Sequence, residues 1–354
     1  MKTIQRLYLK DFIKLLIILA VGLSAIFSLL DLTGKIDDFM AGKPSAGDLV
    51  LYALLNMPRF SLYLLPMSVL ICSLFTFSQA FHRKEITAIK TAGGRLRTLF
   101  YPFIAAGILL SLLAFVTGEV IVPYCSKKAV ELKNSFEGKS RKLAFNDGGL
   151  WLKSKNGDPV KIDLFVVEKK MAKGVSIFVT GKDFLSERIS AEKAYWNGST
   201  WVLEDVTKYD VGNGKMEKLK TVEYPALESP DFFSEEIKTT DEMSMSELYR
   251  YMERLKNAGF KNIKLAVDIN SKISFPLINI FMMLLGISLS LRVGFGGALF
   301  SAGLGLLISL IYWFSYTFSL SIGYAGILPP VVSAWTIPFV FGMLATHLFV
   351  RIPE

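Results

Sequence analysis

Residues 99–122 have the sequence LFYPFIAAGILLSLLAFVTGEVIV, which is apolar over nearly its whole length. A helix needs about 20 mainly apolar residues to cross the hydrocarbon core of a bilayer, so this run predicts a membrane-spanning helix. A long, more polar stretch separates it from the next apolar run, and the order therefore predicts three membrane helices, one folded domain and three further helices. Six runs of this kind occur, near 12–31, 52–79, 99–122, 271–291, 297–321 and 329–349.

The overall composition agrees with a membrane protein. The chain has 354 residues, of which 52% are hydrophobic and 13% aromatic, and its mean hydropathy is +0.42. An ordinary soluble chain of this length is less apolar. The first run is longer than the core of a cleavable signal peptide and lacks convincing small-residue cleavage spacing, so we expect an uncleaved helix.

Basic residues in short loops predict the orientation, because Lys and Arg favour the cytoplasmic side. With six crossings, one side receives Lys2, Arg6, Lys10, Lys14, His82, Arg83, Lys84, Lys90, Arg95, Arg97, Arg292 and Arg351. The loop at 32–48 is flanked and filled by acids, namely Asp31, Asp37, Asp38 and Asp48, against Lys35 and Lys43. We therefore expect both termini in the cytoplasm, and this loop and the insert on the outer side.

The insert is almost balanced in charge. Residues 123–265 hold 25 basic and 22 acidic residues, although the whole chain has a net charge of +9. The positive excess thus belongs mainly to the membrane part, and the balance argues against nucleic-acid binding by the insert.

The sequence of the insert is typical of β structure. The stretches 161–167 and 175–180 are rich in β-branched and aromatic residues, and Asn197-Gly198 is a turn signal between the aromatic runs around Trp196 and Trp201. Many short strands with regular turns favour a sandwich or a jelly roll. We predict a membrane α+β protein with a β-jelly-roll at 123–240, between helices in 1–122 and 266–354.

A short amphipathic helix is predicted in the linker 241–265. Ser244 and Glu247 have capping-box spacing, and Gly259 can end the helix. Leu248, Tyr251, Met252 and Leu255 form one apolar face. This face fits packing beneath the β domain better than binding to the membrane surface, although both remain open.

The sequence contains no recognisable catalytic constellation. It lacks a G-x-x-x-x-G-K-[ST] phosphate loop, H-E-x-x-H and G-x-S-x-G. Its two cysteines, Cys72 and Cys125, are expected too far apart to bridge, and His82 and His347 are its only histidines, so we expect no metal site and no cofactor in this chain. Ionisable residues are nearly absent from the middle of the apolar runs, unlike in ion-coupled transporters.

The connector between the second and third runs, FHRKEITAIKTAGG at 81–94, is the best candidate for a point where another protein drives this one. Ile86 and Ile89, with Ala88 and Ala92, predict a short helix that has a small-residue face and ends at Gly93-Gly94. Such a helix, with one acid and flanking bases, fits docking into a cleft of a partner. A solvated loop whose bases only set the topology is the alternative.

Two stripes of small residues occur at four-residue spacing. Small side chains allow membrane helices to approach closely. Packing inside the bundle is the first interpretation, and an interface with a partner subunit or a lateral gate is the second. The stripes are Ala20, Ser24 and Ser28 in the first run, and Gly297, Ser301 and Gly305 in the fifth.

One motif runs from Leu65-Pro66 through Arg83, Lys84, Glu85, Thr87, Ala88, Ala92 and Gly93. Further motifs are Ile189-Ser190-Ala191, Trp196 to Trp201-Val202-Leu203, Lys272 to Leu277, Leu328-Pro329-Pro330 and Ala334-Trp335. In these motifs, which follow in order along essentially the whole chain, the protein resembles the lipopolysaccharide-export permeases of the LptF/LptG family. Asp11, Phe12 and the stretch Leu29–Asp31 resemble the LptG branch more.

The resemblance implies a non-enzymatic subunit of an ABC exporter in the bacterial inner membrane. Such a permease pairs with a sister permease (LptF/LptG type) around a cavity open to the outer leaflet, and a cytoplasmic ABC ATPase dimer uses the ATP. The periplasmic domain passes lipopolysaccharide to jelly-roll proteins of the LptC/LptA type, and no nucleic acid takes part. By position, Glu85 is the acid of the coupling helix.

This substrate suggests a role for cations near the outer membrane surface. Lipid A carries anionic phosphates there, and Lys or Arg side chains hold phosphates by charge-assisted hydrogen bonds. Lys35, Lys43, Arg59 and Lys272 are expected at that level, and ordinary snorkelling to the interface is the alternative.

Two other functions remain open. A lipoprotein-release permease normally has four helices and its large domain after the first, which differs from the order here. A membrane-anchored periplasmic scaffold or receptor would bind proteins through the β domain, without lipid or an ATPase.

Overall fold

A computed structural model describes residues 2–36, 39, 42–94, 96–136, 143–146, 149–166, 170–180, 185–210, 214–227, 230, 243–257, 262–293 and 297–352. Asp37, Asp38, Arg95, Val167 and Gly259, named above, lie outside these residues. The chain divides into two compact units. One comprises Met1–Phe136 with Thr240–Glu354, and the other comprises Glu137–Thr239. Each unit is described by itself.

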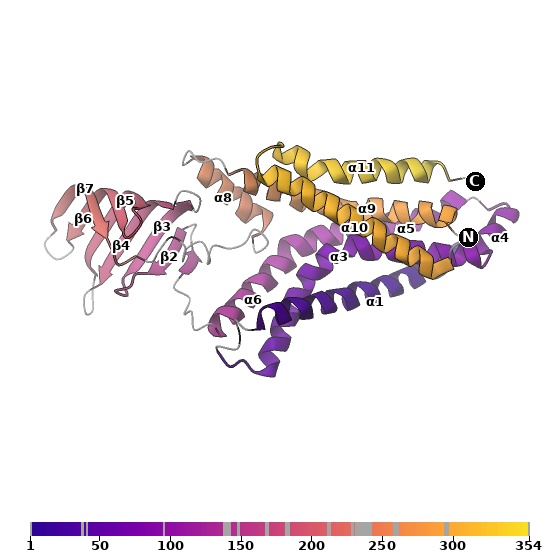
Figure 1. The fold of residues 1–354 in the computed structure, drawn as a ribbon, viewed down its shortest axis with the longest axis horizontal. Helices are drawn as coiled ribbons and strands as arrows, with labels where there is room; N and C mark the ends of the chain where they lie inside the picture. The colour runs from indigo at the N-terminus through magenta and orange to yellow at the C-terminus, as the bar shows by residue number, and fades with distance from the viewer. Residues whose placement is uncertain are drawn as a thin grey trace. The chain divides into compact units, whose positions relative to one another are not determined.

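The first unit is a bundle of helices (Figure 1). Its elements are α1 (Lys2–Gly34), α3 (Ala46–His82), α4 (Glu85–Thr91), α5 (Leu96–Val116), η1 (Thr117–Ile121), α6 (Val122–Phe136), α8 (Met245–Asn257), α9 (Ile263–Val293), α10 (Gly297–Tyr324) and α11 (Pro330–Val350). Among the described residues, six helices are long and apolar enough to span a membrane, as the sequence predicts. Both chain termini lie at the end of the bundle that carries α4.

The third membrane helix is longer than expected. A π-helical turn, η1, joins α5 directly to α6, and the helix therefore continues to Phe136 rather than ending near 122. Residues 123–136 thus belong to the helical unit, whereas the sequence prediction assigned them to the β domain. The reason is that α6 buries Val122 and Ala129 against the bundle despite its polar average composition.

The core of the bundle combines aromatic rings with close helix contacts. Phe12 of α1, Phe77 of α3 and Phe103 of α5 are fully buried, and their rings meet edge to face at 4.7 and 5.8 Å between centroids. At Gly286, α9 approaches α3 so closely that an added Cβ would lie 2.4 Å from the Cβ of Ser73. The bundle is therefore packed as small residues in membrane helices allow.

The second unit is one antiparallel sheet. Its strands are β1 (Leu143–Asn146), β2 (Gly149–Lys153), β3 (Pro159–Val166), β4 (Met171–Thr180), β5 (Leu185–Trp196), β6 (Trp201–Asp210) and β7 (Met216–Tyr224). The predicted strands at 161–167 and 175–180 fall in β3 and β4. The predicted hairpin joins β5 to β6, where Trp196 pairs with Trp201 and Asn197 Oδ1 accepts the Thr200 N–H at 2.8 Å.

The jelly roll itself stays a prediction. The seven described strands pair in chain order, β1 to β7, as a meander within one antiparallel sheet. Each strand is antiparallel to its sequence neighbour, because hairpins join successive strands. One apolar face, which includes Ile162, Ile177, Trp201 and Leu203, forms the core of this unit.

The linker helix forms as predicted. In α8 the Ser244 N–H donates to the Glu247 carboxylate at 3.0 Å, and the Glu247 N–H donates to Ser244 Oγ at 3.3 Å. This is the expected capping box. Leu248 and Leu255 are buried in the helical unit.

We predict that Gly286→Ala destabilises the bundle by about 1–3 kcal/mol, because the new methyl group overpacks the contact between α3 and α9. The matched control is Gly22→Ala in α1, where an added Cβ has no neighbour within 4 Å. This control should be neutral or gain up to about 1 kcal/mol of helix propensity. Thermal unfolding in one detergent compares the two variants, and equal midpoints would contradict the packing argument.

Candidate functional site

The connector between α3 and α5 is a short helix with defined ends. Lys84 has a left-handed backbone (φ 57°) before α4. After α4, Gly93 (φ 76°) donates to the Lys90 carbonyl, and Gly94 donates to the Ile89 carbonyl. Glycine at such a helix end is favoured because it lacks the Cβ that makes positive φ costly. The prediction that Gly93-Gly94 ends this helix is confirmed.

The two sides of α4 differ as the sequence suggests. Ile86 is 2% exposed in the core of the bundle, and Ile89 packs against the same core. Thr87, Ala88, Thr91, Ala92 and Gly93 are exposed. The helix thus anchors itself with isoleucines and presents small side chains outward, which is a surface that another protein can approach closely.

Glu85 lies where α4 meets α1. Its carboxylate accepts a hydrogen bond from the Tyr8 hydroxyl of α1, and the Tyr8 ring meets Phe77 of α3. Glu85 is half-buried, whereas Arg83 and Lys84 beside it are exposed. The acid expected to face a partner is therefore held by the first helix, and Tyr8 is a participant that sequence reasoning missed.

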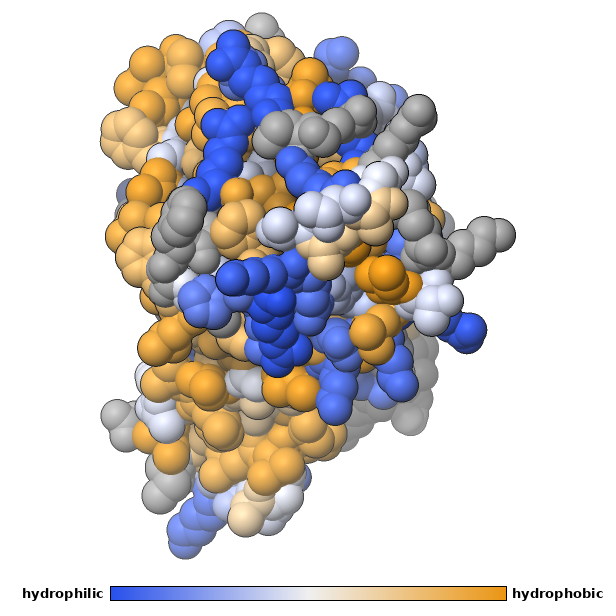
Figure 2. All heavy atoms as spheres, turned by 90° about the vertical axis from the view of Figure 1, so that its right-hand side faces the viewer, coloured by the Kyte–Doolittle hydropathy of each residue, from blue (hydrophilic) through white to orange (hydrophobic). Residues whose placement is uncertain are grey.

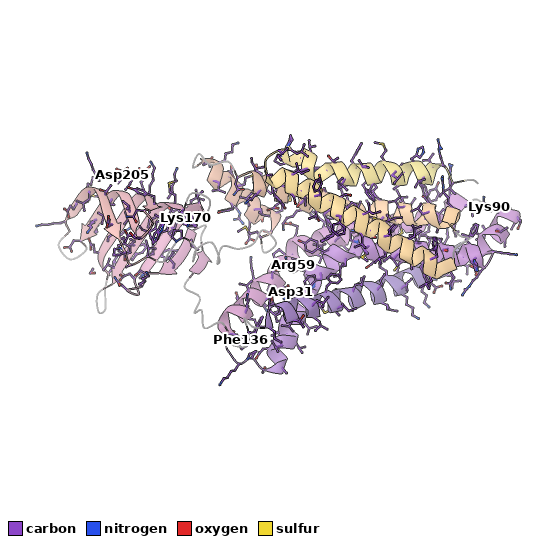
Figure 3. All side chains as sticks on the ribbon, viewed as in Figure 1. Asp31, Arg59, Lys90, Phe136, Lys170 and Asp205 are labelled. Carbon is purple, nitrogen blue, oxygen red and sulfur yellow. The ribbon has the colours of Figure 1, made fainter. Side chains whose placement is uncertain are left out.

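A cavity of about 250 Å³ adjoins this contact, and Tyr8, Asp11, Lys14, Gln79, Arg83 and Glu85 are among its lining residues. Figure 2 views the structure from the end that carries α4 and the termini. Hydrophilic side chains gather over much of that end, and hydrophobic ones lie along its flanks. Lys90 marks the same end in Figure 3.

Lys35 lies towards the opposite end, with Asp31, which Figure 3 labels. Its ammonium group donates to both carboxylate oxygens of Asp31, at 2.8 and 2.9 Å, and to the Tyr52 hydroxyl of α3 at 3.2 Å. Burial lowers the pKa of Lys35, but the hydrogen bonds to Asp31 and Tyr52 outweigh it, so the pKa is raised above its usual value. Lys35 is therefore a fixed cation.

The other three predicted phosphate contacts lie in different surroundings. Lys43 is exposed in the turn before α3, with a positive φ of 50°. Arg59 is half-buried within α3. Lys272 of α9 donates to the Met243 carbonyl at 2.6 Å and lies 3.7 Å from the Glu119 carboxylate, so its partners differ from those of Lys35.

Glu119, which lies beside Lys272, is the second residue of the candidate sites that sequence reasoning missed. It lies in η1, and its carboxylate accepts the backbone N–H of Met245, the first residue of α8, at 2.7 Å. A carboxylate at the end of an apolar run was the available signal, because ionisable residues inside membrane helices are usually functional or paired.

The small-residue stripes pack within this chain. Ser24 and Ser28 are 2% and 1% exposed, and the Ser28 hydroxyl donates to the Ala53 carbonyl of α3, while Ala20 is also buried. In α10, Ser301 donates to Ser78 of α3 at 2.7 Å, and a Cβ on Gly305 would lie 3.2 Å from the Cα of Ile71. Gly297, the first residue of α10, has open space around it. Apart from Gly297, the second stripe contacts α3, as Ser28 of the first stripe does, which favours the packing interpretation over an exposed gate.

We predict that Lys35 reacts with an amine-acylating ester several-fold more slowly than the exposed Lys43 at mildly alkaline pH. Acylation needs the neutral amine, and a raised pKa lowers the neutral fraction. Asp31→Asn should accelerate the reaction of Lys35, and Asp48→Asn should not. Peptide mass spectrometry measures each rate. Equal rates for Lys35 in all three proteins would contradict the paired arrangement.

Comparison with known proteins shows the family of this chain. Residues 6–351 match the family described as lipopolysaccharide export system permease LptF/LptG. The chain is 25% identical to the lipopolysaccharide export system permease protein LptG of Escherichia coli strain K12 over 283 residues, which cover 78% of this chain and 77% of the relative. The LptG protein of Escherichia coli O6:H1 strain CFT073 matches to the same extent. With nearly its whole length matched, this chain belongs to the LptF/LptG family of lipopolysaccharide export permeases.

Proposed function

We propose that this chain is the permease half of an ATP-driven exporter that takes lipopolysaccharide from the outer leaflet of the bacterial inner membrane and passes it to a periplasmic bridge. The observation that carries the proposal is α4, whose small-residue side is exposed while Ile86 fixes it to the core. Family membership as a lipopolysaccharide export permease supports the substrate. No ATP-binding loop occurs in the sequence, so a separate ABC ATPase dimer supplies the energy.

The contacts of α4 suggest how force from the ATPase reaches the membrane helices. A partner that grips Thr87, Ala88 and Ala92 displaces α4 as a unit, because Ile86 is buried in the bundle. The Glu85–Tyr8 hydrogen bond then transmits the displacement to α1, and the covalent connections transmit it to α3 and α5. In this proposal Glu85 has two tasks, which are to face the ATPase groove and to hold α1.

Cations near the outer end are proposed to hold lipid A phosphates. Lys43 is exposed, so a phosphate can reach it directly. Lys35 and Lys272 are held by Asp31 and Glu119, and a phosphate must share or replace these carboxylates. An ammonium group has three donors, which makes sharing feasible. Arg59 offers a planar fork that matches phosphate oxygens.

The edge of the sheet is proposed to accept a strand from a periplasmic jelly-roll partner. The meander ends at β1 and β7. β7 carries Glu217, Lys218, Lys220 and Glu223, and charges on an edge discourage pairing. β1, with the sequence LAFN, lacks such charges, so β-augmentation is favoured there.

The assembly is proposed to pair this chain with a sister permease in the inner membrane, with both termini and α4 in the cytoplasm. The LptG relatives favour the LptG branch. The clustering of both termini with α4 at one end supports this orientation.

We predict that Glu85→Ala lowers both co-purification of the ATPase and ATP-driven release of lipopolysaccharide from proteoliposomes. The variant loses the hydrogen bond that the Glu85 carboxylate is proposed to form with the ATPase groove. Loss of a hydrogen bond to a charged group costs about 1.5–3 kcal/mol, which corresponds to roughly ten- to hundredfold in affinity for the ATPase. Glu253→Ala, at an exposed acid of α8, is the matched control. Tyr8→Phe should retain ATPase binding but weaken coupling of hydrolysis to release.

Intact docking and release in the Glu85→Ala variant would disprove the coupling assignment. If the wild type itself showed no ATP-dependent release of lipopolysaccharide, the result would instead contradict the exporter and favour a scaffold.

We also predict that photocrosslinking residues introduced along 143–152 trap a neighbouring periplasmic protein during transport. The same residues placed along β7 should trap much less, because its charged edge disfavours strand addition. Crosslinked products are identified by mass spectrometry. Equal trapping at both edges, or none under working conditions, would refute the proposal for β1.

A further inference from the structure

A second cavity lies inside the helical unit, away from α4. Its volume is about 340 Å³, and its walls come from α3, the continuous helix α5–η1–α6, α9 and α10. The lining is largely apolar and includes Leu62, Phe115, Phe275 and Leu320. All these elements belong to one compact unit and to predicted membrane spans. The cavity is therefore a slot within the bundle of a single chain.

Local irregularities explain why the helices leave space here. The π-helical turn Thr117–Ile121 inserts an extra residue into the third membrane helix, and such turns frequently occur at functional sites. Gly118 within this turn lines the cavity, and an added Cβ would approach Leu62 to 3.3 Å. Pro276 of α9 lies on the facing wall and lacks the N–H that completes a regular helix.

One end of the cavity is polar and carries charges of both signs. Glu119 and Lys272 form an ion pair at 3.7 Å with only 18% and 17% of their side chains exposed. Asp268 accepts a 2.6 Å hydrogen bond from the Tyr324 hydroxyl. Among the described residues that line the cavity, the charged side chains are these two carboxylates and one ammonium group.

The polar rim and the apolar slot are arranged along the helices. Asp268 lies near the first turn of α9, and Pro276 lies roughly 12 Å deeper at 1.5 Å per residue. Tyr324 is the last residue of α10. The rim is thus at the end of the bundle opposite α4, and the slot runs into the membrane span.

We propose that this cavity binds one hydrocarbon chain of a zwitterionic phospholipid, whose ammonium head group contacts Glu119 and Asp268 and whose phosphate contacts Lys272. The volume is near the lower limit for ligand pockets, so it holds a single chain rather than the several chains of lipid A. Because the lining offers carboxylates as well as an ammonium group, it matches a zwitterionic head group better than a purely anionic one. Carboxylates have several acceptor positions each, and both can share a donor with their protein partners.

The site shares Lys272 with the proposed lipid A phosphate contacts, but its slot takes a different ligand. Its occupant comes from the surrounding membrane and requires neither the ATPase nor the sister permease. Binding at this cavity can therefore be measured on the chain alone, in the absence of lipopolysaccharide and of export.

The test uses the full-length chain in bilayer nanodiscs and phosphatidylethanolamine with a photoreactive diazirine on one acyl chain. We expect the label on peptides that contain 114–122 and 271–276. Unlabelled phosphatidylethanolamine should compete roughly fivefold better than phosphatidylglycerol, which lacks the ammonium group. Gly118→Leu fills the slot and should lower labelling of these two peptides about tenfold. Labelling of the lipid-facing helix surfaces should fall much less.

The matched control is Gly303→Leu, since Gly303 is exposed on α10 and an added Cβ has no neighbour within 4 Å. Its labelling of both peptides should equal that of the wild type. If Gly118→Leu fails to fold, the wild-type label map and the competition decide alone. Labels confined to the outer helix surfaces, or equal competition by both lipids, would overturn the proposal.

Discussion

The close contact between α3 and α9 is the interaction on which the rest of the bundle depends. Gly286 lets α9 reach Ser73 of α3, and the membrane span of α9 is 61% buried, more than that of any other span. Helices in lipid gain no hydrophobic free energy by associating, so close packing of small residues must hold them together. The remaining spans, α1, α5, α10 and α11, pack around this pair.

This packing also positions the polar contacts at both ends. At one end, the Tyr8 hydroxyl can donate to the Glu85 carboxylate because α1 and α4 both pack against the core around Phe77. At the other end, Glu119 reaches Lys272 and the first N–H of α8 across the contact of α5–η1 with α9. Polar groups are costly in hydrocarbon unless they are paired. The pairs therefore lie near the ends of the helices, where the bundle can also connect to partners.

The linker helix α8 joins these features to the chain that forms the sheet. Glu247 both closes the capping box and forms an ion pair with Lys127 of α6 at 3.1 Å. Lys272 and Glu119 hold the start of the same helix. The chain thus leaves the bundle through α6 and returns through α8, and these two helices are fixed to each other.

The sequence by itself determined the features that depend on neighbouring residues. Apolar length gave the six spans, Ser244 with Glu247 gave the start of α8, Gly93-Gly94 gave the end of α4, and Asn197-Gly198 gave a hairpin. Tertiary structure decided the pairings between distant residues: Tyr8 with Glu85, 77 positions apart, and Glu119 with Met245, 126 apart. It also decided that the third span continues to Phe136 and that the strands form a meander. These outcomes depend on which surfaces pack together. A local pattern of residues does not specify which distant residues it will contact.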